Sequence, residues 1–429
     1  MKRFLLPLLG TASLILAAGA QARTVTTASS ESFRNSIGVN THIVYFDTPY
    51  SDWSRIVSEL QSLGVTHLRD GVYANPAPSW HDWNQRYYDD VEYAAAHGLK
   101  FDFGMGEPGF RAGTLDQLAK VVSGPLRNAV EGLEAPNEFD HFGAVRNWSQ
   151  ALATYDRALY EAVKHNASLR SLPVIGPSLM GAKSPAELGN QAKWLDLGNI
   201  HPYTGGQAPT ATHTESELAR AARVAPGKRV WATEAGFNNA LRAPVTAADQ
   251  PPVSEHAGAI YTLQTVLDNY KSGIARTYLY ELIDESADPG NAAPEEHYGL
   301  LRSNFTPKPA FTALKNLLEL VGSGAPSGAA KPPTVRLTGS SDVNELELEH
   351  SDGTVSLVLW RSDSVWSTTR RRSLNVRPVG VRVALPAHSR VRRADPIASA
   401  SSSAVRLLRG GAVIHVGADP IVLQITRGG

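Results

Sequence analysis

The sequence contains no cysteine, and this absence excludes three kinds of chemistry. Disulfide bonds, thiolate metal sites and cysteine nucleophiles all require a thiol. A chain of 429 residues can nevertheless bury a sizeable core without covalent cross-links. At this length we expect two folded units rather than one.

Common metal-binding motifs are also missing. The sequence has no His-Glu-x-x-His stretch and no His-x-His pair at the end of a predicted strand. We therefore predict no metal site and no cofactor. Asp284, Glu285 and Asp288 do cluster late in the chain. A solvated loop, a calcium site and contact with a cationic sugar all fit that cluster.

Long apolar runs are confined to the N-terminus. Lys2 and Arg3 precede an apolar stretch from Phe4 to Ala18, and Ala20-Gln21-Ala22 has the small-x-small pattern of a cleavage site. This layout predicts a signal peptide over residues 1–22, cleaved after Ala22, and hence a secreted or periplasmic protein. The alternative is a membrane anchor. The run is short for that role and no charged flank follows it, so we expect no membrane span.

Net charge is zero, but the two signs are unevenly distributed. Residues 333–429 hold 13 arginines, no lysine and eight acids, whereas residues 23–332 hold 26 basic and 33 acidic residues. An acidic main unit argues against nucleic acid as a partner. Two readings stay open for the C-terminal arginines, including Arg370-Arg371-Arg372. A solvated sheet face is favoured over contact with an anionic polymer.

A strand-then-helix pattern recurs about eight times between Ser36 and Leu320. It predicts a parallel (β/α)₈ TIM barrel over residues 23–325. The predicted strands are Ile37–Tyr45, Val65–Val72, Leu99–Gly104, Val130–Glu138, Leu172–Ser178, Asp196–Tyr203, Arg229–Glu234 and Ala275–Glu281. An open doubly wound sheet is the alternative, but it lacks a glycine-rich loop after its first strand. The Gly-x-Gly-x-x-Gly match at Gly104–Gly109 follows the third strand, and we interpret it as a loop at the barrel rim.

Helix boundaries are marked by local signals. Gly64 ends a predicted helix over Ser51–Leu63. Capping-box spacing at Thr114 with Gln117, and at Thr214 with Glu217, predicts two helix starts.

Composition changes at a linker from Gly322 to Pro333, after which the helical period disappears. A C-terminal β-sandwich over residues 326–429 is predicted, and the segment after the signal peptide is a candidate source of further strands. The predicted strands are Val343–Glu349, Val355–Trp360, Val376–Leu385, Val405–Leu408, Ala412–Val416 and Ile421–Thr426.

Two glutamates end predicted strands of the barrel, Glu138 the fourth and Glu234 the seventh. Active sites of such barrels lie at the carboxyl ends of the strands. Glycoside hydrolysis needs one protonated and one ionised carboxyl group. We predict Glu138 as general acid/base and Glu234 as nucleophile. Arg69 and Tyr203 are expected to keep Glu234 ionised, while burial and the charge of Glu234 are expected to keep Glu138 protonated.

These positions together resemble a known group. Asn137-Glu138 and Glu234, with His201-Pro202-Tyr203 on strand six and Arg69 on strand two, resemble the clan A glycoside hydrolases. The barrel followed by a sandwich resembles the family 39 enzymes. The resemblance implies net retention of configuration through a covalent glycosyl-enzyme, with Asn137 contacting the sugar 2-hydroxyl.

Further substrate contacts are predicted near the strand ends. Many clan members have a tryptophan at the end of strand eight, where this chain has Tyr278-Leu279-Tyr280, and either tyrosine is a candidate floor for the sugar. Asn40 and His42 fit sugar contact and structural roles equally. Trp80 is among the aromatic residues that fit stacking on a sugar face.

The expected partner is therefore a polysaccharide or oligosaccharide. A non-catalytic carbohydrate-binding protein and a transglycosylase on the same fold are the alternatives, and a metal-dependent barrel hydrolase is a distant one. The sequence fixes neither the sugar nor the choice between internal and terminal cleavage.

Overall fold

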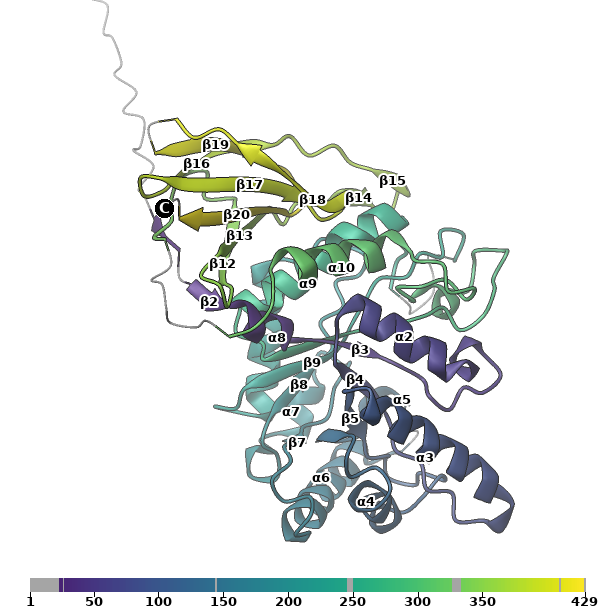
Figure 1. Cartoon of the computed structure of the whole chain (residues 1–429). Coiled ribbons are helices and arrows are strands. Elements are labelled where there is room, and N and C mark those ends of the chain that lie inside the picture. The colour runs from purple at the N-terminus through teal and green to yellow at the C-terminus, as the bar shows by residue number, and fades with distance from the viewer. Residues whose placement is uncertain are drawn as a thin grey trace, which may run out of the picture.

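The computed structural model describes residues 23–25, 27–142, 145–244, 250–325, 333–408 and 410–427. The predicted signal peptide lies outside these residues. Figure 1 shows a barrel with a stack of sheets on one side of it and helices α9 and α10 in between. Among the described helices, none combines the length and apolarity needed to cross a bilayer.

The first part is a parallel eight-stranded sheet, in which β3 lies between β4 and β10. A parallel bridge between Ile175 and Leu197 joins the two ends of the sheet, so it closes into the predicted barrel. The strands are β3 (Ile37–Asn40), β4 (His67–Gly71), β5 (Lys100–Gly104), β6 (Val130–Glu134), β7 (Val174–Ile175), β8 (Gly198–Ile200), β9 (Val230–Ala235) and β10 (Arg276–Leu279).

Several barrel strands end earlier than predicted. β6 ends at Glu134 and β8 at Ile200, each a few residues before a proline. Pro136 and Pro202 have no N–H to donate to a neighbouring strand, so pairing cannot continue through them. Glu138 and His201 therefore lie in the loops just beyond the strands.

Helices follow the strands around the barrel. They are α1 (Ser30–Arg34), α2 (Trp53–Leu63), α3 (His81–Ala96), α4 (Leu115–Ser123), α5 (Phe139–Phe142), α6 (Trp148–His165), α7 (Ser184–Leu188), α8 (Ala211–Val224), α9 (Glu255–Lys271) and α10 (Pro309–Leu320), with 3-10 turns η1 (Pro49–Ser51), η2 (Pro78–Trp80), η3 (Ala192–Trp194) and η4 (Pro294–His297). Gly64 ends α2 in the left-handed conformation, and the Thr114–Gln117 capping box is present, as predicted.

The predicted helix start at Thr214 is wrong. Helix α8 begins one turn earlier, where the Thr210 hydroxyl accepts a hydrogen bond from the backbone N–H of His213. Thr214 is a buried residue inside the helix, and its hydroxyl donates to the carbonyl of Thr210. Thr214 has Glu217 at the capping-box spacing, whereas Thr210 has His213 there, so the box rule points to the wrong threonine and the actual cap uses a single threonine hydroxyl.

The second part is the predicted β-sandwich, and its two sheets begin with strands from the segment after the predicted signal peptide. The four-stranded sheet contains β1 (Arg23–Thr24), β11 (Arg336–Gly339), β16 (Val379–Ala384) and β19 (Gly411–Val416). The six-stranded sheet contains β18 (Ser399–Val405), β17 (Ser389–Asp395), β20 (Ile421–Arg427), β13 (Val355–Trp360), β12 (Asn344–Glu349) and β2 (Thr27–Ser29). A separate hairpin joins β14 (Trp366–Ser367) to β15 (Arg372–Ser373).

Two strands of the six-stranded sheet were not predicted. β17 alternates exposed Arg390 and Arg392 with buried Val391, so few apolar residues mark it. β18 is largely serine, which has little preference for strands. The predicted strand Val405–Leu408 is wrong, because Val405 ends β18 and Leu408 makes only a bridge to Gly411.

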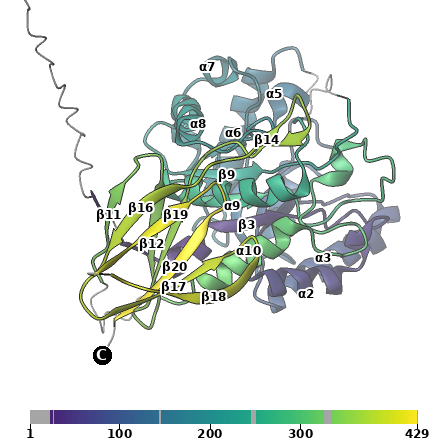
Figure 2. The same cartoon turned by 90° about the horizontal axis from the view of Figure 1, so that it is seen from above.

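The six-stranded sheet packs on both of its faces. One face shares a core with the four-stranded sheet, and the other joins the barrel core, which includes α10. Every residue of β13 is consequently buried, which accounts for its continuous apolar run. Seen from above in Figure 2, the sheets flank the barrel beside α9 and α10, while β14 extends over the barrel. The Trp360 indole on β13 donates to Asp268 on α9 at 3.0 Å.

Candidate active site

A cavity of about 320 Å³ opens where the barrel strands end at their carboxyl termini. It is lined by residues that follow β3, β4, β5, β6, β9 and β10, which places it at the face where barrel enzymes hold their sites. The predicted site residues in its lining are Asn40, His42, Arg69, Asn137, Glu234 and Tyr280.

Glu138 and Glu234 approach each other across this face. Carboxylate oxygens of both, together with a ring nitrogen of His201, lie within 4.8 Å of one another. The two glutamate side chains are largely buried, at 11% and 12% exposure. Strands β6 and β9 thus deliver two neighbouring carboxyl groups to a place shielded from bulk water.

Arg69 is the centre of the hydrogen-bond network below the cavity. Its guanidinium group donates to both oxygens of Glu134 at 2.7 and 2.9 Å, and to Glu234 Oε1 at 2.6 Å. It also donates to the amide oxygens of Asn40 and Asn137 at 2.9 and 2.8 Å. All five of its donors are used. Arg69 is therefore occupied in holding protein groups, and is not free to contact a substrate.

Glu234 is stabilised in its ionised form. Burial alone would raise its pKa, but the charges of His201 and Arg69, and hydrogen bonds from Arg69 and Tyr203, bring the pKa below the usual value. The Tyr203 hydroxyl donates to Glu234 Oε2 at 2.9 Å, while Arg69 binds the other oxygen. Both oxygens are thus held, so the orientation of the carboxylate is fixed as well as its charge.

Glu138 sits in a different environment. Its backbone has a φ of 47°, a left-handed conformation that costs a residue other than glycine of order 1–3 kcal/mol. Its N–H donates to the Ser178 hydroxyl at 3.1 Å, which helps to hold this conformation. Its Oε1 lies 2.7 Å from His201 Nδ1. In place of the arginine that faces Glu234, Glu138 faces an imidazole.

The second nitrogen of His201 defines which tautomer is present. His201 Nε2 lies 3.0 Å from the Thr233 hydroxyl, and that hydroxyl donates its only proton to Asn199 Oδ1 at 2.8 Å. Thr233 must therefore accept from Nε2–H, so a single proton remains for the contact between Nδ1 and Glu138. Burial would lower the pKa of His201, but the charge of Glu234 and the contact with Glu138 raise it. His201 and Glu138 thus share one proton in this contact.

Asn40 and Asn137 take different roles in the structure. Asn40 is buried, and its amide donates to the carbonyls of Thr233 and Leu279 while its oxygen accepts from Arg69. Of the two roles predicted for Asn40, sugar contact and a structural role, these contacts favour the structural role. Asn137 is exposed, and its oxygen accepts from Arg69, so its amide N–H groups are directed away from that contact.

The aromatic candidates are also separated. Tyr280 lines the cavity, whereas Tyr278 is fully buried in the barrel against Trp231. Trp80 is 41% exposed on η2 and packs on Trp83. It is not among the residues that line the cavity. Three further aromatic side chains do line it, namely Tyr45, Tyr73 and Phe110.

Sequence reasoning missed the polar layer under the two carboxylates. Glu134 is fully buried, clamps Arg69, and accepts from the Asn199 amide at 3.0 Å. Asn199 in turn accepts from Thr233. Side chains alternate along a strand, so Glu134, Asn199 and Thr233 were recognisable as polar residues at inward-facing positions of apolar strands.

The acids after β10 do not form the three-acid calcium site that the sequence allowed. Asp284 pairs with Lys308 at 2.7 Å, and Asp288 accepts from the backbone N–H groups of Gly290, Ala292 and Ala293. Each of these two carboxylates is thus committed to its own partners. Glu285 instead lies near His42 and Glu281.

Comparisons with known proteins give no match by sequence and clear matches by structure. No protein-family model and no curated protein sequence matches the chain. A family 39 glycoside hydrolase from the gut symbiont Bacteroides cellulosilyticus WH2 is 17% identical over 94% of this chain and 83% of its own, with a TM-score of 0.59. A monomeric β-xylosidase from Caulobacter crescentus CB15 is 14% identical over 96% of this chain and 98% of its own, with a TM-score of 0.59. A glucosidase from Croceicoccus marinus is 12% identical over 96% of this chain and 99% of its own, with a TM-score of 0.61.

The chain has the fold of the family 39 glycoside hydrolases. The matches cover both the barrel and the sandwich, since each spans at least 94% of the chain. At this level of identity they establish the family 39 architecture. The chemistry has to be argued from the residues of the site itself.

Proposed function

We propose that the protein is a retaining glycoside hydrolase, with Glu234 as nucleophile and Glu138 as general acid/base. The observation that carries this proposal is the close approach of their carboxylate oxygens, within 4.8 Å. Retaining enzymes hold the two carboxyl groups about 5–5.5 Å apart, whereas inverting enzymes leave room for a water at about 6.5–9.5 Å. The different partners of the two glutamates support the assignment of roles.

In the first step Glu234 attacks the anomeric carbon and forms a glycosyl ester. Arg69 and Tyr203 hold its carboxylate ionised and oriented before the attack. The proton shared by Glu138 and His201 passes from Glu138 to the departing glycosidic oxygen, so the alcohol leaves neutral. Asn137 lines the cavity, and its amide donors would contact a sugar hydroxyl.

In the second step water replaces the alcohol. Once Glu234 is esterified its negative charge is gone, and Glu138 is left without its proton. Glu138 then accepts a proton from the water that attacks the anomeric carbon, and Glu234 leaves as a carboxylate. The proton returns to the Glu138–His201 contact, and both glutamates recover their starting states.

The substrate is proposed to be a polysaccharide or oligosaccharide outside the cytoplasm. The N-terminal segment supports export, since it has the layout of a signal peptide cleaved after Ala22. Structural neighbours include a β-xylosidase and a glucosidase. Xylosides and glucosides therefore belong in the first substrate panel, beside plant, microbial and exopolysaccharide glycans.

The test measures release of reducing ends by the wild type, Glu138→Gln and Glu234→Gln. Glutamine keeps the shape of each side chain but cannot ionise. Loss of either group is expected to reduce the rate by at least about 10³-fold on the substrate that the wild type cleaves. Glu161→Gln makes the same chemical change on the exposed surface of α6, and is expected to leave the rate unchanged.

The alternatives give different results in the same assay. Full activity in Glu234→Gln would refute the assignment of the nucleophile. A binding protein would bind a glycan of the panel equally well in wild type and both variants, without releasing reducing ends. A transglycosylase would yield longer oligosaccharides, which chromatography of the products resolves from hydrolysis.

A further inference from the structure

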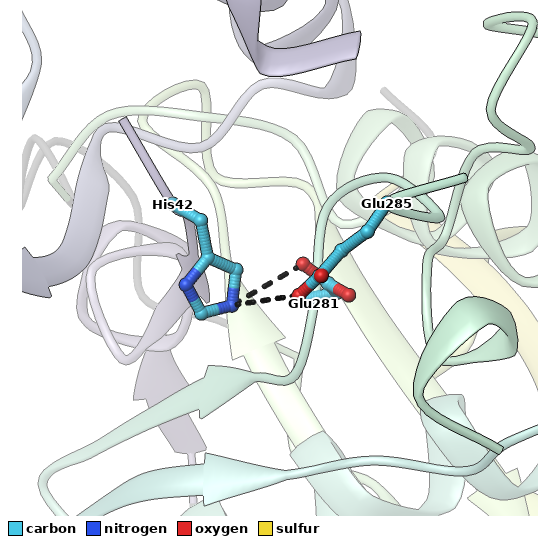
Figure 3. A group of neighbouring side chains, drawn as sticks. All are labelled: His42, Glu281 and Glu285. Carbon is cyan, nitrogen blue, oxygen red and sulfur yellow. Dashed lines mark ion pairs between the residues drawn. The ribbon is translucent and has the colours of Figure 1, made fainter. Parts of the chain in front are cut away.

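We propose that His42, Glu281 and Glu285 form a binding site for one divalent metal ion of the zinc type, beside the catalytic cavity. Figure 3 shows the His42 imidazole facing the carboxylate groups of the two glutamates. One ligand atom from each of the three residues lies within 4.8 Å of the other two. The proposal concerns metal binding, and does not depend on the glycosidase activity.

The distances fit an ion between the groups better than direct hydrogen bonds. His42 Nε2 lies 3.4 Å from Glu281 Oε2 and 3.8 Å from Glu285 Oε1. Two ligands that each bind Zn²⁺ at about 2.1 Å, in tetrahedral geometry, lie about 3.4 Å apart. A hydrogen bond between a nitrogen and an oxygen is ordinarily about 2.9–3.0 Å long. An ion bound by His42 and Glu281 would therefore need little movement of either group, whereas Glu285 would have to move closer to His42.

Buried polar atoms in this cluster have no hydrogen-bond partner. Glu281 is fully buried, and its Oε1 is among the unsatisfied atoms of the described residues, as is His42 Nε2. Leaving such atoms unpaired costs about 1–3 kcal/mol each, and more for charged groups. A bound cation would give His42 Nε2 a partner, and a Glu281 carboxylate that bound it through both oxygens would pair Oε1 as well.

The charge around the cluster is negative. Two carboxyl groups, those of Glu281 and Glu285, meet at a single imidazole. Within the part of the chain that the structure describes, the ion pairs of Glu281 and Glu285 are both with His42, and neither is with a lysine or arginine. The acids nearest in sequence, Asp284 and Asp288, are committed elsewhere. A divalent cation would supply the missing positive charge.

Two of the three ligands, His42 and Glu281, are held in place by neighbouring rings. The His42 ring stacks on Tyr45 with the centroids 4.5 Å apart, and meets Tyr50 and Tyr280 edge-on at 5.8 and 5.7 Å. The Tyr50 hydroxyl donates to Glu281 Oε2 at 2.9 Å. Hydrogen bonds of this kind from a second layer of residues orient the ligands of metal sites. The His42 and Glu281 side chains are thus preorganised.

The donor set selects the class of ion. One imidazole nitrogen with two carboxylates suits Zn²⁺ and its transition-metal neighbours, whereas Ca²⁺ prefers six to eight oxygen ligands. Three protein ligands leave a fourth tetrahedral position for water or a substrate hydroxyl. His42 also lines the cavity that contains Glu234, so the ion would lie at the cavity wall.

The test uses the untagged full chain after treatment with a chelator, titrated with Zn²⁺ in a calorimeter. We expect one ion per chain, and at least about 100-fold weaker binding in both His42→Ala and Glu285→Gln. Glu107→Gln removes a different carboxylate of the same cavity, and should keep the zinc affinity within about 2-fold of wild type. Co²⁺ bound in place of Zn²⁺ should give a visible absorption spectrum that both ligand variants lose.

Three outcomes would overturn the proposal. These are the absence of saturable binding at one ion per chain, binding that persists unchanged in both ligand variants, and a loss of affinity in Glu107→Gln equal to that in Glu285→Gln. Equal competition by Ca²⁺ would overturn the assignment to a zinc-type ion. Circular dichroism checks the fold of each variant. Glu285 is partly exposed, so Glu285→Gln is expected to fold. If His42→Ala is unfolded, the result for Glu285→Gln decides the test.

Discussion

Arg69 has no hydrogen-bond donor left for a substrate, so its contribution to the reaction has to be indirect. Its guanidinium group joins Glu134 on β6 to Glu234 on β9, so in the proposed mechanism it acts on the reaction through Glu234. Burial would lower the pKa of Arg69, but the charges of Glu134 and Glu234 raise it well above the usual value, so it stays a cation at any working pH. It is a positioning residue.

A lysine at this position should therefore be a poor replacement. Arg69→Lys keeps the charge but cannot make five directed hydrogen bonds. We expect kcat to fall about 100-fold or more, with a smaller change in KM, because the orientation of Glu234 is lost while the substrate contacts remain. Steady-state kinetics on the preferred substrate give both numbers. A change confined to KM would instead indicate that Arg69 binds the substrate.

Tyr203 provides a test of the charge state of Glu234. Its hydroxyl donates to the carboxylate and favours the ionised form, so its removal favours the protonated form and raises the pKa of Glu234. The acid limb of the kcat/KM profile should therefore move to higher pH in Tyr203→Phe, by about 0.5–1 unit. The pH–rate profile of the variant measures this directly. An unshifted acid limb would mean that another group controls it.

The sequence predicts which side chains meet in the site where the order of the strands alone brings them together. Glu138, Glu234 and Tyr203 follow three different strands, and the barrel topology alone brings them to one face. The roles of Asn40 and Trp80 could not be predicted, because they depend on whether local partners satisfy or cover the side chain. Only the packed structure decides that.

The β14–β15 hairpin forms a sheet of its own, separate from the two sheets of the sandwich. Arg371, in the turn of this hairpin, donates to the carbonyls of Leu241 and Ala243. Those residues belong to the loop that follows β9, the strand that carries Glu234. The Trp366 indole on β14 also donates to the carbonyl of Pro252 at 3.1 Å. The sandwich thereby supports a loop at the rim of the candidate active site.

Removal of the Arg371 side chain should loosen that loop selectively. In Arg371→Ala we expect amide hydrogen exchange at Arg242 and Ala243 to be about 10-fold faster, because the opening of the loop costs less free energy. The melting temperature should change little. Arg390→Ala removes an exposed arginine of β17 and is the matched control. Equal exchange in both variants would show that the hairpin does not restrain the loop.

Elements with strong patterns were predictable, and weakly patterned ones were not. The apolar run of β13 and the caps of α2 and α4 are visible in the sequence. The serines of β18 and the arginines of β17 form strands because β20 and the barrel offer them partners, which no local propensity encodes. The choice between Thr210 and Thr214 as helix cap likewise depended on the surrounding structure.

The barrel and the sandwich share buried contacts through α9. All residues of this helix from Ala257 to Asn269 are buried, and the Gln264 amide donates to the carbonyls of Arg361 and Ala418 in the sandwich at 2.9 Å each. Two strands from the N-terminal segment, β1 and β2, add further links across the molecule. Such an interface resembles a shared core, and we expect both parts to unfold together.

Trp360 is the residue with which to test this cooperativity. Trp360→Ala opens a cavity between the sandwich and α9 and removes the donor to buried Asp268, at an expected cost of about 3–5 kcal/mol. Urea unfolding followed by far-UV circular dichroism should show a single transition at lower urea in the variant. Hydrogen exchange of sandwich and barrel amides should shift together. A sandwich that unfolds separately from an unaffected barrel would contradict the shared core.

The most direct test of the central claim is azide rescue on the aryl glycoside that the wild type cleaves best. Glu138→Ala still forms the glycosyl ester from a good leaving group, so azide should restore turnover and give a glycosyl azide with the configuration of the substrate. Glu234→Ala cannot form the ester, so azide should attack the substrate directly and give the inverted product. NMR of the anomeric proton reads both configurations. Inverted azide from Glu138→Ala, with retained azide from Glu234→Ala, would contradict the assignment of the two glutamates.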